Sequence, residues 1–318
     1  MATRSLLTAL LVLTSLAGAR AQDDLMAMLE AEQEPVVNYA FATFKSTRIV
    51  SGHSVETNGE GVMQFLIGHR FGRVNAGWRD LFGLDNATIR IGLDYGITDD
   101  LDIGFGRSSF TKAWDGFVKY RFLRQKSGAK KFPFTATAIA SMMIRSDDWP
   151  VPTRENYITS RFYYTYQLLI ARKFGEWVSL QIMPTVVHRN LVATAADNNT
   201  VFSMGFGTSV RLTGSLRFNM EYVWVIPGQI ASPVAGEPVR DSFSMGVDLE
   251  TGGHVFQLHF TNARGMHEKF LASETSGRWL DGDIHFGFNV SRVFTLYDRN
   301  VRAQKRAVRK EEKAASAD

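Results

Sequence analysis

The sequence predicts an all-β protein, an antiparallel up-and-down transmembrane β-barrel of about 12 strands, and three observations carry this prediction. Large apolar residues recur at every second position. They do so over segments of roughly 10–15 residues, whereas a tilted strand needs about 9–11 residues to cross a membrane and soluble strands most often have about 5–6. The links between the segments alternate between short turns and longer loops, as in bacterial outer-membrane barrels.

Residues 87–98 show the alternation most clearly. Ile89 and Leu93 belong to an apolar series that is separated by polar or small residues, among them Arg90 and Asp94. Because successive side chains of a strand point to opposite faces, one face is apolar and the other polar. We expect the apolar face to contact lipid and the polar face to line the lumen of a closed barrel. A soluble β-sandwich or propeller is the alternative, but it would need neither the long segments nor the alternating links.

The alternating segments number twelve between residues 61 and 296, the predicted barrel. Their predicted bounds are 61–74, 87–98, 100–108, 112–124, 133–146, 157–173, 177–190, 200–213, 215–227, 241–251, 254–264 and 282–296. Bacterial barrels have an even number of strands and short periplasmic turns. Counting the links on this basis places both termini in the periplasm.

The first 21 residues have the pattern of a secretory signal peptide. Arg4 is followed by an apolar stretch at residues 5–18, and small residues stand at Ala19 and Ala21. The apolar stretch is shorter than the roughly 20 residues of a membrane-spanning helix, which disfavours an uncleaved anchor. We therefore expect residues 1–21 to be removed after export and the mature protein to reside in the outer membrane of a Gram-negative bacterium.

Two further segments flank the predicted barrel. Residues 22–60 begin with an acidic stretch and continue with a mixed stretch in which Lys45 and Arg48 would fall on opposite faces of a strand. Because such a segment suits lipid contact poorly, we expect residues 37–60 to lie like a plug inside the barrel or at its periplasmic mouth. Residues 297–318 form a charged C-terminal tail, predicted to be a solvated helix or a disordered segment, whose periplasmic partner the sequence does not indicate.

A resemblance to a known family rests on two stretches, residues 44–57 (FKSTRIVSGHSVET) and 61–72 (GVMQFLIGHRFG). They resemble an uncharacterised, domain-of-unknown-function family of bacterial outer-membrane β-barrel proteins, and the resemblance extends from about Val37 to Phe294. It implies an outer-membrane barrel fold and brings no catalytic residues, because no activity is established for the family. Residues 285–294 (HFGFNVSRVF) also resemble the closing strand of outer-membrane proteins, although this chain continues beyond the final aromatic residue.

The inward-facing charged positions carry the functional prediction. The predicted lumen-lining residues, possible determinants of selectivity, are Arg90, Asp94, Asp102, Asp115, Lys119, Arg121, Arg145, Arg161, Arg189, Arg211, Arg217, Glu221, Asp248 and Glu250. Charged walls select permeant ions, so the main prediction is a narrow porin-like channel for small polar solutes or ions, with a slight anion preference. Barrels of about 8 strands are filled by side chains and those of about 16–18 hold an aqueous channel, so a non-conducting structural barrel is the alternative. A hydrolase on a barrel scaffold is the third hypothesis.

Composition and motifs indicate no catalytic residue, metal site or cofactor, and we do not expect an enzyme. The chain has no Cys, a net charge of +4 that is too small to suggest nucleic-acid binding, and no HExxH spacing among its 7 His. His259 and His285 are expected to face the lumen as ordinary polar residues. The expected partners are outer-membrane lipid and, during biogenesis, the barrel-assembly machinery.

Overall fold

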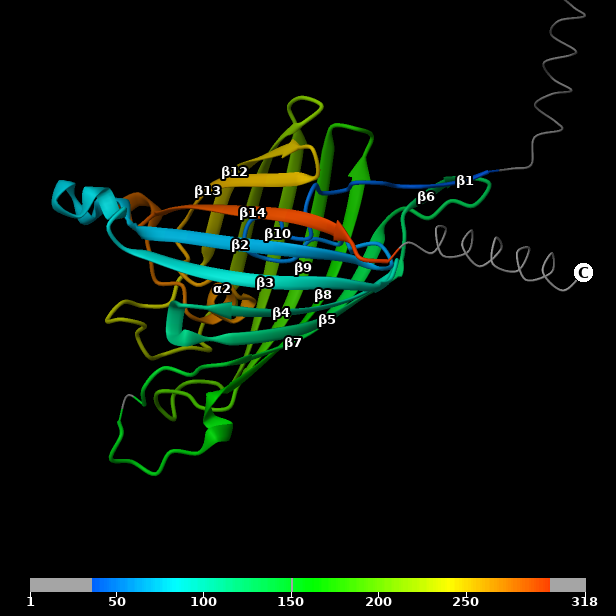
Figure 1. The fold of residues 1–318 in the computed structure, drawn as a ribbon. Coiled ribbons are helices and arrows are strands. Elements are labelled where there is room, and N and C mark those ends of the chain that lie inside the picture. The colour runs from blue at the N-terminus through cyan, green and yellow to red at the C-terminus, as the bar shows by residue number, and fades with distance from the viewer. Residues whose placement is uncertain (1–35, 150, 298–318) are drawn as a thin grey trace, which may run out of the picture. The chain divides into compact units, whose positions relative to one another are not determined.

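The computed structural model describes residues 36–149 and 151–297, in which twelve antiparallel strands close into a barrel (Figure 1). The order around the barrel is β10-β11-β12-β13-β14-β2-β3-β4-β5-β7-β8-β9, so barrel strands that follow one another in the chain are neighbours. The barrel strands are β2 (Val62–Arg73), β3 (Ala87–Thr98), β4 (Leu101–Ser108), β5 (Trp114–Leu123), β7 (Thr135–Ile144), β8 (Phe162–Phe174), β9 (Val178–Arg189), β10 (Thr200–Arg211), β11 (Leu216–Val225), β12 (Ser242–Thr251), β13 (His254–Thr261) and β14 (His285–Thr295).

The barrel is closed by the pairing of its first strand, β2, with its last, β14. Met63 lies opposite Phe294, and Ile67 lies opposite Val290. A register shift next to His285 interrupts the ladder near the start of β14. Because the closed ladder leaves no free strand edge, the backbone polar groups of the wall can be paired within the sheet, as hydrocarbon surroundings require.

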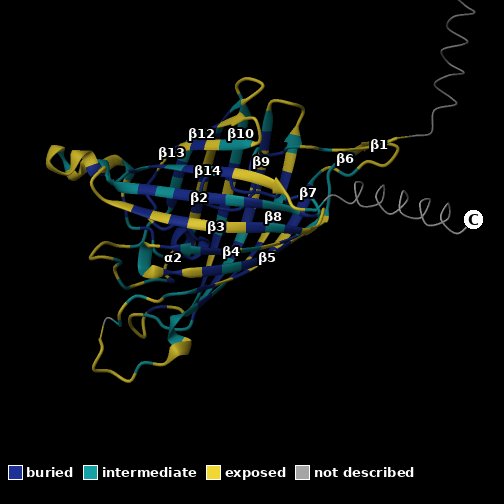
Figure 2. Cartoon of the chain, in the orientation of Figure 1, coloured by how far each residue is buried: buried dark blue, intermediate teal, exposed yellow. Residues whose placement is uncertain are grey.

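Side-chain burial alternates along the barrel strands (Figure 2). Leu93 on β3 has an exposed fraction of 44%, whereas the next residue, Asp94, is fully buried. Phe105, Phe206 and Leu258 are exposed in the same way on three other strands. The apolar faces therefore turn outward, where they suit contact with lipid, and the polar faces turn into the barrel.

The predicted fold class and strand count are confirmed. Each predicted segment corresponds to one barrel strand, and most of the predicted bounds differ from the observed bounds by at most 3 residues. The largest difference is at the start of β8, predicted at residue 157, because Ile158–Arg161 form a short 3-10 helix instead. The predicted signal peptide (residues 1–21) and all but the first residue of the predicted tail (297–318) lie outside the described residues. The side of the membrane on which the termini lie stays a prediction.

A separate two-stranded antiparallel sheet, which the sequence did not predict, is formed by β1 (Val37–Tyr39) and β6 (Lys126–Gly128). The remaining elements are short helices in the longer links. They are the 3-10 helices η1 (Val74–Ala76), η2 (Trp78–Gly83), η3 (Phe110–Lys112), η4 (Ile158–Arg161) and η5 (Trp279–Asp281), and the α-helix α2 (Glu268–Ser273). Within the described residues, none of the helices has the length and apolar character needed to cross a membrane.

The lumen as candidate functional site

Residues 43–58, which we call the plug, lie inside the barrel. Nearly all of them are buried, although they form no regular helix or strand. The segment folds back on itself, because the backbone N–H of Ile49 donates to the C=O of Gly52 at 2.9 Å. Near its two ends, the backbone N–H of Thr43 donates to the carboxylate of Glu56 at 2.7 Å. The plug is therefore a hairpin-like loop whose ends are close together and whose turn is buried in the lumen.

The plug enters the lumen from the end of the barrel that carries the short turns. Thr57 Oγ1 donates to the C=O of Asp99, in the turn between β3 and β4, at 2.8 Å. The backbone N–H of Asn58 donates to the carboxylate of Asp102, at the start of β4, at 2.8 Å. If the short turns are periplasmic, as the sequence predicts, the plug enters from the periplasm.

The backbone of the plug is held by side chains of the wall. Glu221 on β11 accepts hydrogen bonds from the backbone N–H groups of Gly52 at 2.9 Å and Val50 at 3.3 Å. Gln181 on β9 accepts from the N–H of Val55 at 2.9 Å. A buried segment that joins no helix or sheet must find other partners for its N–H and C=O groups, and the inward polar residues supply them.

Strands β13, β14 and β5 also hold the plug. The side-chain amide of Gln257 on β13 donates to the C=O of Ile49 at 3.0 Å, and that of Asn289 on β14 donates to the C=O of Val50 at 2.7 Å. Lys119 on β5 donates to plug carbonyl groups as well. Because contacts reach the plug from strands distributed around the barrel, it fills the lumen instead of lining one wall.

An apolar cluster adds to these polar contacts. It contains the plug residues Phe44, Ile49, Val50 and Val55 and the inward-facing wall residues Phe117, Ile139, Leu169, Ala171 and Met183. All of them are buried, and burial of one such large side chain is worth about 1.5–3 kcal/mol. The plug is therefore anchored by hydrophobic packing on the β5, β7, β8 and β9 side of the barrel.

The packing leaves no room for a methyl group at Gly207 on β10. A Cβ atom there would overlap Cδ1 of Ile49, so we expect Gly207→Ala to lower the free energy of unfolding by about 1–3 kcal/mol. Urea unfolding in lipid vesicles measures the difference. Gly116→Ala is the control, because the nearest atom to a Cβ there is a carbonyl oxygen at 3.5 Å. An equal loss of stability in both variants would contradict the predicted overlap.

A second segment occupies the lumen from the other end. The link between β13 and β14 contains α2, whose residues are all buried and which packs against β8, β9, β10 and β11. Arg48 of the plug donates to the carboxylate of Glu268 in α2 at 2.8 Å, and both side chains are buried. The plug and α2 therefore meet inside the barrel through an ion pair.

Two histidines lie beside this ion pair without adding charge to it. His53 Nε2 is 3.3 Å and His267 Nε2 is 3.4 Å from the carboxylate of Glu268. Burial lowers the pKa of His53 well below its usual value, and burial also lowers the pKa of His267. Both rings are therefore neutral at neutral pH, and Arg48 is the charged group that compensates Glu268.

Most of the predicted lumen-lining residues are buried. They are Arg90, Asp94, Asp102, Asp115, Lys119, Arg189, Arg217, Glu221 and Asp248. Arg90 binds Asp115 through two hydrogen bonds, one of them 2.9 Å long between Nε and Oδ2. The carboxylate of Asp94 has no hydrogen-bond partner among the described residues, although Arg90 is nearby. Arg189, at the end of β9, donates to the C=O of Asn198 in the next link. The others face the plug or one another, so they do not border an open path.

The other predicted lining residues are less buried and lie near strand ends. They are Arg121, Arg145, Arg161, Arg211 and Glu250. Arg121 pairs with Asp100 at 2.8 Å, and Glu250 pairs with Lys45 at the end of the barrel through which the plug enters. The structure thus divides the predicted set into buried residues, most of them around the plug, and less buried residues at the two ends of the barrel.

Several residues that hold the lumen together were not among those predicted. Gln181, Gln257 and Asn289 share the inward parity of the charged residues, and this parity was the signal that could have identified them. Arg70 on β2 is fully buried, donates to Asn289 and Ser51, and forms no ion pair with a described residue. Glu268 gave no periodic signal, because it lies in a link.

Cavities between the plug and the wall are small, whereas a larger one lies at the long-loop end. Two voids beside the plug have volumes of about 10 Å³ each, which is about the space of one water molecule. A cavity of about 560 Å³ lies at the long-loop end, next to Arg264 and Phe270.

His259 and His285 are both buried. Among residues 36–149 and 151–297, no group of three or more His, Asp or Glu is placed to hold a metal ion.

A closed barrel with an apolar outer face and a polar, plugged lumen defines a membrane-spanning β-barrel of the outer-membrane type. The chain belongs to the family described as the membrane bound beta barrel domain (DUF5777), which matches residues 44–294. This family agrees with the resemblance seen in the sequence. No curated protein matches the chain.

Solved barrels resemble the chain at low sequence identity. The NanC porin has a TM-score of 0.45 and 7% identity, over 73% of this chain and 98% of that one. An outer membrane channel from Pseudomonas putida F1 has a TM-score of 0.45 and 12% identity, over 76% and 98%. LpxR from Salmonella typhimurium has a TM-score of 0.33 and 11% identity, over 73% and 99%. These similarities are too low to transfer a function.

Proposed function

We propose that the protein is a gated pathway for small polar solutes or ions across the outer membrane, closed while the plug occupies the lumen. The observation that carries the proposal is the polar contact between plug and wall. Glu221, Gln181 and Gln257 bind the plug through its backbone, and water can replace such hydrogen bonds when the plug leaves. Both ends of the plug lie at one end of the barrel, so it can leave as a single loop.

The lumen without the plug would suit solutes of either charge. Among the predicted lining residues that are buried, Arg90, Lys119, Arg189 and Arg217 are basic, and the five acidic ones oppose them. Charge rings of one sign make a pore selective for ions of the other sign. We therefore expect weak ion selectivity once the plug has moved.

A permanently closed, structural barrel is the second candidate. It is favoured by the apolar cluster around Phe44 and Ile49 and by the buried ion pair between Arg48 and Glu268. These contacts would have to break before the plug could move. The two candidates differ in whether the intact protein ever conducts: a gated pathway opens for part of the time, and a structural barrel does not. Deletion of the plug should give a conducting barrel in either case.

Deletion of residues 43–58 is expected to give a folded barrel with a larger single-channel conductance than the intact protein, because the deleted segment fills the lumen. Planar-bilayer recordings measure the conductance, and a shift in gel migration on heating verifies that the barrel has folded. Deletion of residues 22–35, which leaves the plug in place, is the control and should not change the conductance.

A cross-link tests whether the plug itself is the gate. Thr47 Oγ1 donates to Gln64 Oε1 on β2 at 2.7 Å, so Thr47→Cys and Gln64→Cys can be joined by a short bifunctional thiol reagent. The chain contains no other thiol. We expect the joined protein to stay closed. Free conduction through the joined protein, or a folded deletion variant that does not conduct, would overturn the proposal.

A further inference from the structure

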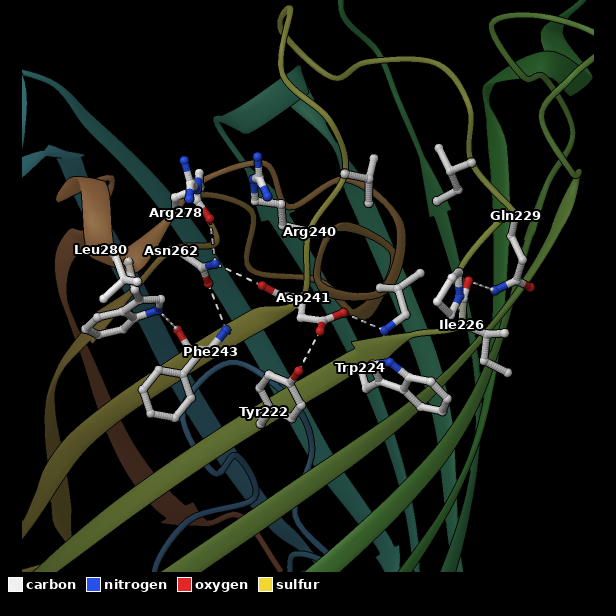
Figure 3. A pocket seen from close by; sticks show the side chains of 17 residues that line it. Tyr222, Trp224, Ile226, Gln229, Arg240, Asp241, Phe243, Asn262, Arg278 and Leu280 are labelled. Carbon is white, nitrogen blue, oxygen red and sulfur yellow. Dashed lines mark hydrogen bonds between the residues drawn. The ribbon is translucent and has the colours of Figure 1, made fainter.

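An open groove of about 590 Å³ lies at the long-loop end of the barrel, between the ends of β11 and β12 and the links that follow β11 and β13 (Figure 3). Tyr222 and Trp224 line it and are on the outward face of β11, because Val223 between them is buried. Phe243 lines it from β12. The groove is therefore on the lipid side of the wall, outside the lumen and separate from the plug.

The lower part of the groove is aromatic. Phe243 lies between two other rings, with its centroid 6.4 Å from that of Tyr222 and 5.0 Å from that of Trp279. Trp279 Nε1 donates to the C=O of Phe243 at 3.0 Å, which fixes the indole. Leu280, the next residue, is 96% exposed. Tyr and Trp concentrate at the level of lipid headgroups, so this arrangement places the groove at a membrane interface.

Positive charge lies next to these aromatic rings. Arg240 and Arg278 lie above Tyr222 and Phe243 in Figure 3. Arg278 pairs with Asp281 at 2.9 Å, and both side chains are about half exposed. Within the described part of the chain, the guanidinium of Arg240 has no hydrogen-bond or ion-pair partner, and its Nε is buried. Arg240 is thus a cation that borders an open cavity without a counter-charge.

The acidic residue of the groove is already engaged. The carboxylate of Asp241 accepts hydrogen bonds from Tyr222 Oη and from the backbone N–H of Val225, the latter at 2.9 Å. Asn262 donates to the C=O of Asp241 at 2.9 Å and holds the backbone of this corner in place. The groove therefore has an aromatic side that is fixed in place, a carboxylate that already accepts hydrogen bonds from the protein, and a guanidinium without a partner.

We propose that this groove binds the phosphate headgroup of an anionic membrane lipid in the leaflet on the long-loop side. Arg240 binds the phosphate through charge-assisted hydrogen bonds, and Arg278 lies on the same side of the groove as a second cation. The acyl chains lie along Tyr222, Trp224 and Phe243, whose outward faces are apolar. A lipid suits the site better than a soluble anion does, because one side of the groove is aromatic and faces the membrane.

Native mass spectrometry of the full-length protein, released from nanodiscs, tests the proposal by counting bound lipids. We expect retention of phosphatidylglycerol in preference to phosphatidylcholine, and about a tenfold loss of affinity for phosphatidylglycerol in Arg240→Gln. Heat-modifiable gel migration verifies that each variant is folded. The control is Arg107→Gln, because Arg107 stacks over the outward-facing Trp114 at the same end of the barrel, 5.0 Å from the ring centroid, but does not border the groove.

Each outcome bears on the proposal. Loss of binding in Arg240→Gln with retention in Arg107→Gln supports it, and a similar loss in Trp224→Ala supports the placement of the acyl chains. Equal loss in both arginine variants would mean general attraction of anionic lipid to the rim, and it would overturn the proposal. Displacement of phosphatidylglycerol by an equal concentration of inorganic phosphate would also overturn it, because the site would then bind the free anion.

Discussion

Glu268→Gln is expected to destabilise the closed state by about 3–5 kcal/mol and to increase the fraction of time for which the barrel conducts. The substitution keeps the shape of the side chain but removes its charge. Arg48 would then be a buried guanidinium without an ion-pair partner among the described residues, and Lys119 is near enough to repel it. Repulsion and lost hydration would both favour a state in which the plug is displaced. Planar-bilayer recordings measure the open fraction, and urea unfolding in vesicles measures stability.

The double variant Arg48→Met/Glu268→Met is the matched control. Replacing both partners of a buried ion pair with apolar residues is often neutral or stabilising, because no unpaired charge is left. We therefore expect this variant to stay as closed as the wild-type protein. If both variants conduct to the same extent, the contact between plug and α2 acts through shape, and the role assigned to its charge is wrong.

Leu93→Arg is expected to lower the free energy of unfolding by about 2–4 kcal/mol, because it places a charge near the middle of β3 on the face that contacts lipid. The side chain of Leu93 has an exposed fraction of 44% and points away from the lumen. Urea titration of the protein folded into vesicles gives the stability, and gel migration with and without heating gives the folded fraction.

The cost of this change should depend on depth in the bilayer. Leu212 is also outward and is 50% exposed, but it lies in the turn after β10. Arginine near the interface costs only about 0–1 kcal/mol, so Leu212→Arg should change stability little. If the two substitutions cost the same, the outer surface of the barrel does not face a bilayer.

The barrel could be predicted from the sequence because two independent constraints act on each strand. The membrane fixes its length, and the contrast between lipid and lumen fixes an alternation of period two, as Leu93 and Asp94 illustrate. Link lengths add a prediction of the direction in which each strand crosses the membrane. The start of β8 was misplaced because Ile158 and Arg161 keep the parity of the strand but belong to a 3-10 turn, which hydrophobic alternation does not reveal.

The interior could be predicted only in part. The charges of Lys45 and Arg48 predicted that the segment before β2 avoids lipid, but its partners leave no side-chain pattern. Val50 and Gly52 are held through their backbone N–H groups, which every residue except proline has. The position of α2 depends on the tertiary contact between Glu268 and Arg48, residues far apart in the chain. Neither composition nor periodicity records such a contact.

The closing pair of strands has a consequence for assembly. β2 gains its second neighbour only when β14 is available, so the wall stays open along one side until nearly all of the chain is present. Pairing between such distant segments is slow, because a long loop of chain must be ordered before the contact forms. Residues 43–58 precede β2 and remain tethered beside this gap. The rates of two steps therefore decide whether this segment is enclosed. One is the binding of the segment to Glu221 and Gln181, and the other is the final pairing of β14 with β2.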